Sequence, residues 1–138
     1  MDLKSKIILI SGPTASGKSK FALKIAKKLN GEIINADSMQ VYKELNILTA
    51  RPSKTDLNKI DHHLYGFRSV KKKFSTGEWL KLAKKNIKKI RDKNKIPVLV
   101  GGTGLYFKAL TDGLVKIPKI PIQIRNKIRR MQNNLGQK

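Results

Sequence analysis

The chain has 138 residues, a length that suits one domain with a real hydrophobic core. It contains no cysteine, which excludes disulfide bonds and thiolate metal sites. Its 31 Lys and Arg residues outnumber 9 Asp and Glu residues, which gives a formal charge of +22. A polyanionic partner, nucleic acid first, explains such an excess, and so does a compositional bias of the source genome toward Lys, Ile and Asn.

The first apolar run, KIILI at residues 6–10, predicts a strand. It is too short for the apolar region of a signal peptide, and it leads directly into a glycine-rich stretch. No run approaches the roughly 20 apolar residues of a membrane span. We therefore expect a cytoplasmic protein without membrane contacts. Because the run is apolar without alternation, it is typical of a buried central strand of a parallel sheet.

The next segments predict a βαβ unit. Apolar residues recur at helical spacing between residues 21 and 29, and Asn30 with Gly31 marks the end of that helix. Residues 32–37, EIINAD, then indicate a second strand. A strand, a glycine loop, a helix and a strand in this order are typical of α/β domains with a parallel sheet.

Further along, the pattern predicts one more strand and three helices. Ser75 and Glu78 have capping-box spacing in front of an apolar stripe. Residues 96–100, IPVLV, indicate a strand, and the run GTGLYFKAL indicates a helix that ends at Gly113. The tail predicts a helix with a narrow apolar seam formed by Ile124, Ile128, Met131 and Leu135.

Residues 12–19, GPTASGKS, match the phosphate-binding pattern G-x-x-x-x-G-K-[ST] between a strand and a helix. Glycines let backbone amides turn inward, and these amides with the helix N-terminus bind an anion such as diphosphate. Lys18 neutralises phosphate charge, and the Ser19 hydroxyl is suited to Mg²⁺. The predicted phosphate-binding residues are Gly12, Pro13, Thr14, Ala15, Ser16, Gly17, Lys18 and Ser19.

This loop predicts the fold class, an α/β P-loop NTPase-like three-layer domain with a parallel β-sheet. We expect that domain over residues 1–117, followed over residues 118–138 by the start of a helical region. Asp37 ends the second predicted strand, so it belongs to the carboxyl edge of the sheet, where open α/β sheets bind ligands. Three roles remain open for Asp37: a Mg²⁺ ligand, a general base, or a turn residue that bonds with Ser38 to backbone amides.

Five stretches follow one another in the order GPTASGKS, DSMQVYK (37–43), TARPS (49–53), HHLYGF (62–67) and IPVLVGGTGLYFKAL (96–110). Together they resemble the tRNA dimethylallyltransferase (isopentenyl-tRNA transferase) family. That family transfers a dimethylallyl group from dimethylallyl diphosphate to the exocyclic amine (N6) of an adenine adjacent to the tRNA anticodon. The resemblance implies the tRNA anticodon stem-loop and dimethylallyl diphosphate as partners, with Mg²⁺ at Ser19. We expect a monomer.

The resemblance also implies roles for individual residues. Asp37 matches the general base of the family, and Lys18 and Thr103 match further catalytic positions. The implied tRNA contacts are Asp37, Ser38, Met39, Gln40, Thr103 and Arg125. The helical region that begins over residues 118–138 is likewise implied to bind tRNA. From the residues alone, Thr103 is equally a helix cap and Arg125 equally a solvated surface residue. Family members are considerably longer than 138 residues, which implies that the chain is an N-terminal, incomplete form.

Two other functions remain open: a small-molecule kinase that uses the same phosphate loop, and a non-catalytic tRNA-binding fragment. NKID at residues 58–61 matches the guanine-reading motif of GTPases, but no strand is predicted before it. For His62 and His63, structural hydrogen bonds are the expected role, because adjacent histidines do not converge on one ion. For Tyr42, Tyr65 and Tyr106, packing in the core or at its rim is a more frequent role than stacking on bases.

Overall fold

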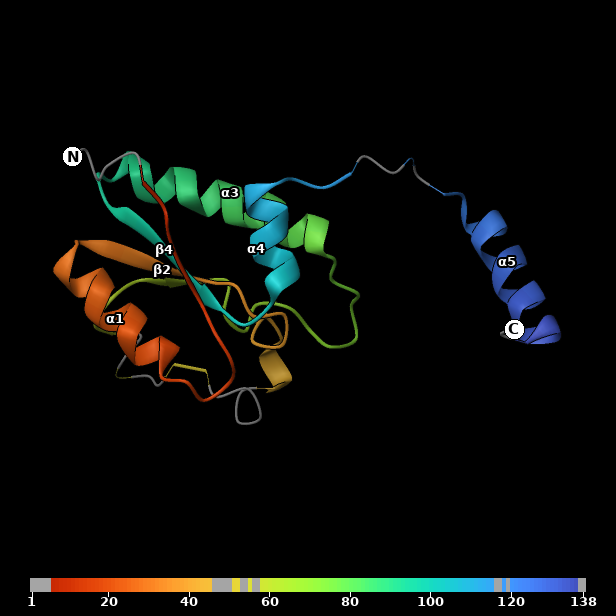
Figure 1. The fold of residues 1–138 in the computed structure, drawn as a ribbon, viewed down its shortest axis with the longest axis horizontal. Helices are drawn as coiled ribbons and strands as arrows, with labels where there is room; N and C mark the ends of the chain where they lie inside the picture. Colours follow the sequence, from red (N-terminus) through yellow and green to blue (C-terminus); the bar gives the residue numbers. More distant parts are fainter. Residues whose placement is uncertain are drawn as a thin grey trace.

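The computed structural model describes residues 6–45, 51–52, 55, 58–115, 118 and 120–136. Residues 49, 50 and 53 of the TARPS stretch and the expected domain boundary at residue 117 lie outside these residues. Figure 1 shows the arrangement of the elements. They are β1 (Ile8–Ser11), α1 (Lys18–Lys28), β2 (Gly31–Asn35), η1 (Lys43–Leu45), β3 (His62–His63), α3 (Thr76–Asp92), β4 (Ile96–Gly101), α4 (Gly104–Thr111) and α5 (Ile122–Leu135).

The four strands form one parallel sheet in the order β1-β4-β2-β3. Strands β2 and β4 occupy its centre, and every residue of both strands is buried. Helix α1 packs on one face, and helices α3 and α4 pack on the other. The predicted three-layer α/β fold is therefore confirmed.

Alternation along β4 divides the core in two. Val98 and Val100 belong to the cluster that also contains Ala22 and Ala26 of α1. Leu99, between them, belongs to the opposite cluster, which contains Trp79, Ala83, Ile87 and Ile90 of α3 and Tyr106 of α4. Because successive side chains of a strand point to opposite faces, one apolar run supplies both cores.

The predicted central position of the first strand is wrong. Among the described strands, β1 pairs only with β4 and lies at an edge of the sheet. Its burial alternates, and Leu9 is 40% exposed. A short apolar run indicates a strand that packs on its faces, but it carries no information on whether a neighbouring strand pairs with each edge.

The predicted helices are confirmed. Ser75 caps α3: its hydroxyl accepts the Glu78 amide N–H at 3.2 Å, and its own amide donates to Glu78 Oε2 at 3.0 Å. Helix α5 stands apart from the sheet, and its apolar seam, which includes Ile128 and Leu135, is exposed. None of the described helices is long and apolar enough to cross a membrane.

Candidate active-site cleft

The glycine-rich loop joins β1 to α1 and has an unusual backbone. Ala15 and Gly17 take positive φ values of 63° and 82°. A Cβ at Gly17 would meet nothing within 4 Å, so the backbone angle is the reason for a glycine there. Gly17 is also the N-cap residue of α1, and the Lys18 ammonium donates to the carbonyl of Pro13 in the same loop. The loop therefore presents the N-terminus of α1 as an anion site.

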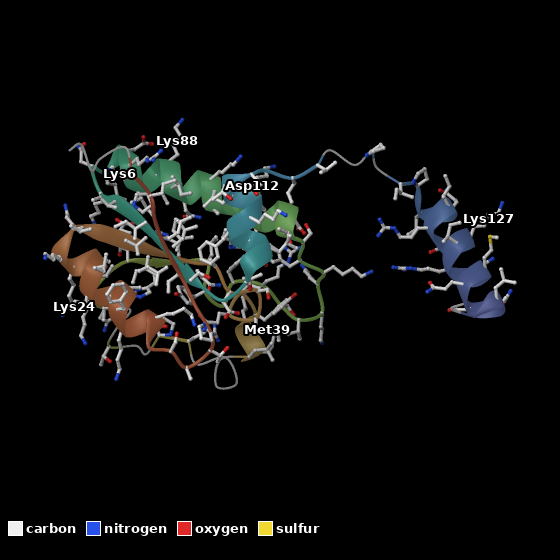
Figure 2. All side chains as sticks on the ribbon, viewed as in Figure 1. Lys6, Lys24, Met39, Lys88, Asp112 and Lys127 are labelled. Carbon is white, nitrogen blue, oxygen red and sulfur yellow. The ribbon has the colours of Figure 1, made fainter. Side chains whose placement is uncertain are left out.

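An open cleft of about 610 Å³ lies beside this loop. Its only carboxylate among the described lining residues is Asp37, and its cations are Lys18 and Lys20. Met39, which is labelled in Figure 2, is half-exposed on the β2–η1 segment of the lining. The lining comprises Thr14, Ala15, Ser16, Gly17, Lys18, Ser19, Lys20, Asp37, Met39, Gln40, Leu45, Tyr65, Val100 and Gly101.

Asp37 lies two residues beyond the end of β2, at the carboxyl edge of the sheet. Its Oδ1 accepts the Met39 amide N–H at 2.9 Å, so the turn role is present. The second oxygen, Oδ2, faces the β4–α4 turn, since a Cβ built at Gly102 would lie 3.9 Å from it. Asp37 also lines the cleft. Its hydrogen bond to the Met39 amide therefore does not exclude a second role as a metal ligand or a general base.

Thr103 connects the β4–α4 turn to the residue after Asp37. Its Oγ1 accepts the Ser38 amide N–H at 2.8 Å, and its hydroxyl donates to Ser38 Oγ at 3.2 Å. Although Thr103 is the N-cap residue of α4, its side chain makes no cap hydrogen bond, so a capping role for the side chain is wrong. Thr103 and Ser38 lie beside the cleft rather than among its lining residues.

The tyrosines separate into different roles. Tyr106 is buried and stacks on Trp79, with ring centroids 4.2 Å apart. Tyr65 lines the cleft, where burial and the neighbouring charge of Asp37 raise the pKa of its phenol above the usual range. Tyr65 therefore keeps a neutral phenol and lines the same cleft as Asp37. Its sequence context did not distinguish this position from ordinary packing at the rim.

The remaining predicted residues lie elsewhere. Arg125 is exposed on α5, which stands apart from the cleft. His62 Nδ1 donates to the Ile60 carbonyl at 2.7 Å, and His63 Nε2 contacts Glu32 Oε2 at 2.7 Å. The structural role expected of both histidines is confirmed. The described residues contain no group of three or more His, Cys, Asp or Glu side chains that could hold a metal ion.

Comparison with known proteins gives one consistent family. A family model described as IPP transferase matches residues 40–138. A tRNA dimethylallyltransferase from Pelagibacter ubique (strain HTCC1062) is 67% identical over all 138 residues, which cover 44% of that relative. The tRNA dimethylallyltransferase of Rhizobium rhizogenes is 54% identical over 88% of this chain and 41% of its own length.

Solved structures agree with these relatives. The tRNA isopentenylpyrophosphate transferase of Bacillus halodurans superposes with a TM-score of 0.78 at 35% identity, over 94% of this chain and 43% of that one. A eukaryotic dimethylallyltransferase acting on tRNA gives a TM-score of 0.76 at 28% identity. The chain thus spans less than half the length of these relatives. The family match over most of the chain, the cleft and the shared fold show that the chain belongs to the IPP transferase family.

Proposed function

We propose that this chain carries the donor-binding and base-bearing part of a tRNA prenyltransferase. The reaction moves a dimethylallyl group from dimethylallyl diphosphate to the exocyclic amine (N6) of an adenine adjacent to the tRNA anticodon. One observation carries the proposal: the phosphate loop and Asp37 line the same cleft. Membership of the IPP transferase family and the tRNA dimethylallyltransferase relatives support this choice of reaction.

The phosphate loop holds the leaving group. The loop amides and the N-terminus of α1 bind the diphosphate, and Lys18 adds a positive charge. During transfer, N6 of adenine forms a bond to the first carbon of the dimethylallyl group. The carbon–oxygen bond breaks, and its electron pair leaves with the diphosphate. Donors that are already in place stabilise the developing negative charge without reorganisation.

Asp37 acts on the nucleophile. An adenine amine is a weak nucleophile because its lone pair is delocalised into the ring. Asp37 accepts a proton from N6 as the new bond forms, which favours attack. The bond from the Met39 amide to Oδ1 orients the carboxylate and leaves Oδ2 for the proton.

The cleft suits Mg²⁺ through oxygen donors alone. The Ser19 hydroxyl lines the cleft with the diphosphate-binding amides, and hydroxyl and phosphate oxygens are ligands that Mg²⁺ prefers. Ser19 would hold the ion, together with the substrate. A bound Mg²⁺ would supply charge neutralisation for the leaving diphosphate.

The tRNA side of the site is the β2–η1 segment. Met39 and Gln40 line the cleft, and the Ser38 amide donates a hydrogen bond to Thr103 beside it. The target adenine must leave its stack to reach Asp37, as in other enzymes that modify bases. Arg125 belongs to α5, so any tRNA contact it makes involves the helical region over residues 118–138, outside the cleft.

The test is transfer of labelled dimethylallyl from its diphosphate to tRNA by the full-length protein. Asp37→Asn is expected to lower kcat by about 10²- to 10⁴-fold, the usual contribution of a general base, with donor binding retained. Asp112→Asn is the matched control, because this exposed carboxylate ends α4 away from the cleft lining. Near wild-type transfer by Asp37→Asn would contradict the assignment of Asp37 as the general base. Absence of transfer by the wild-type protein would contradict the proposed reaction itself.

A further inference from the structure

Asn35 is the last residue of β2, directly before the segment that carries Asp37. Its side chain is fully buried, and it is not among the residues that line the cleft. We propose that Asn35 is a positioning residue of this site: its buried amide fixes Asp37 and the adjoining turn at Leu64 and Tyr65. This inference rests on the proposed function for its effect on the reaction.

Both N–H groups of the Asn35 side-chain amide, and one lone pair of its oxygen, form hydrogen bonds with backbone groups of the adjoining loops. Nδ2 donates to the Asp37 carbonyl at 2.9 Å and to the Leu64 carbonyl at 3.0 Å. Oδ1 accepts the Asp37 amide N–H at 3.0 Å. A reversed amide would place its oxygen against two carbonyl oxygens, so these partners set its orientation. Asn35 therefore holds Asp37 by both backbone polar groups.

The same amide joins two loops that leave neighbouring strands. Strands β2 and β3 pair side by side, and Leu64 directly follows β3. Leu64 has a φ of 63°, a left-handed conformation that leucine rarely adopts and that persists only where surrounding contacts impose it. Tyr65, the next residue, lines the cleft beside Asp37. Through Leu64, Asn35 therefore also supports the loop that carries Tyr65, which lines the same cleft as Asp37.

Asn35 is itself firmly held. Its backbone carbonyl accepts the indole N–H of Trp79 at 2.9 Å, and this contact is buried. In the sheet, Asn35 lies opposite Val100 of the central strand β4. The Trp79 ring in turn stacks on Tyr106. A residue that orients others has to be rigid, and these contacts from α3, α4 and β4 supply that rigidity.

Loss of the amide is expected to affect the chemical step rather than donor binding. In Asn35→Ala the Asp37 backbone loses both of its hydrogen bonds to the amide, and a misplacement of about 1 Å can cost about 10²-fold in rate. The phosphate loop follows β1, two strands away in the sheet, so donor affinity has no reason to change. We expect kcat to fall by about 10- to 100-fold with an unchanged KM for the diphosphate donor.

The first measurement compares variants of the full-length protein in the transfer assay. Asn35→Ser retains one hydroxyl that can replace one of the lost bonds, so its kcat is expected to lie between those of wild type and Asn35→Ala. Glu32→Gln is the matched control: Glu32 is the other fully buried polar side chain described, on the same strand at its opposite end. It is expected to lose stability while it keeps kcat. In an Asp37→Asn background, Asn35→Ala should cause no further loss of kcat, because both act through one carboxylate.

A second measurement needs no activity. Hydrogen–deuterium exchange at the Asp37 amide should be faster in Asn35→Ala and unchanged in Glu32→Gln, because that N–H donates to Asn35 Oδ1. If both kcat and this exchange rate in the Asn35 variants match those of Glu32→Gln, Asn35 is only a structural residue and the inference is wrong. If Asn35→Ala does not fold, Asn35→Ser carries both measurements. A wild-type protein without transfer activity overturns the proposed function alone, because the exchange measurement still decides whether Asn35 places Asp37.

Discussion

Glu32 is the second residue of β2, toward the end remote from the cleft, and it is surrounded by basic groups. Its carboxylate lies 2.7 Å from His63 Nε2, 2.9 Å from Lys95 Nζ and 3.0 Å from Lys93 Nζ. Burial acts to raise the pKa of Glu32, but hydrogen bonds from Lys95, His63 and Lys93 outweigh it and lower the pKa to about 2. The ionised form of Glu32 therefore stabilises the folded protein.

The pH dependence of this contribution follows from its sign. The pKa of Glu32 is lower in the folded state than its ordinary value of 4.5, so the stabilisation is fully present above pH 4.5. It disappears as the pH falls toward 2, and it amounts to something on the order of 3 kcal/mol. Glu32→Gln should lower the free energy of unfolding at pH 7 and flatten its decline between pH 4.5 and pH 2, measured by urea denaturation.

Asp92→Asn, at the exposed end of α3, is the control for that measurement and should retain the wild-type decline. A Glu32→Gln protein as stable as wild type at pH 7 would contradict the prediction. It would mean that the cost of burying the carboxylate equals the gain from its ion pairs.

The residues that sequence reasoning identified in the cleft share one property: local pattern marks them. The phosphate loop matches a contiguous motif, and Asp37 follows a predicted strand. Asn35 and Glu32 were not identified, because each depends on at least one partner that is distant in the sequence. Asn35 bonds to Leu64 across 29 positions, and Glu32 pairs with Lys93 across 61. No spacing rule connects such pairs before the sheet is formed.

At the scale of elements, prediction succeeded where hydrophobic periodicity was long or capping was explicit, as in α3 and β4. It did not identify β3, whose two residues are too short to show any period. It also placed β1 at the centre of the sheet, although the order of strands depends on contacts between them rather than on the composition of each.

The ends of β4 and β2 approach so closely that only glycine fits at residue 101. A Cβ there would lie 2.1 Å from the carbonyl carbon and oxygen of Ala36. Gly101→Ala forces the two strand ends apart and should lower the free energy of unfolding by about 2 kcal/mol or more. Thermal or chemical denaturation measures the change.

Gly104→Ala is the matched control, three residues further along in α4, where a Cβ would meet nothing within 4 Å. Alanine favours helix over glycine, so this variant should be as stable as wild type or more stable. Equal destabilisation by the two substitutions would contradict the role of the close strand approach.

At the scale of the whole molecule, positive charge is spread over both faces of the sheet. Lys24 projects from α1 and Lys88 from α3, the helices that cover opposite faces, and Lys127 projects from α5 (Figure 2). Further exposed lysines on these helices include Lys27, Lys28, Lys84, Lys85 and Lys89. The described surface therefore does not gather its basic residues on one side.

For the proposed binding of tRNA, this distribution predicts how the affinity responds to charge removal. Replacing Lys24, Lys27 and Lys28 by Gln, or Lys84, Lys85 and Lys88 by Gln, should weaken non-specific RNA binding to a similar extent. Each set should reduce the salt dependence of the association constant, because fewer counterions are released. Titration of labelled tRNA at several salt concentrations measures both quantities. A large effect from one helix and none from the other would instead define a specific basic interface.

Strand β2 keeps its two buried polar residues at opposite ends, with Glu32 in the ion-pair cluster and Asn35 behind the cleft. Two residues of extended chain lie between them, which gives a separation of about 10 Å, and effects at sites this far apart without shared partners usually add. Substitutions around Glu32 can therefore adapt the protein to a new temperature or acidity without disturbing Asp37. Substitutions that change stability toward heat or acid and substitutions that change the proposed catalytic step can then arise independently on one five-residue strand.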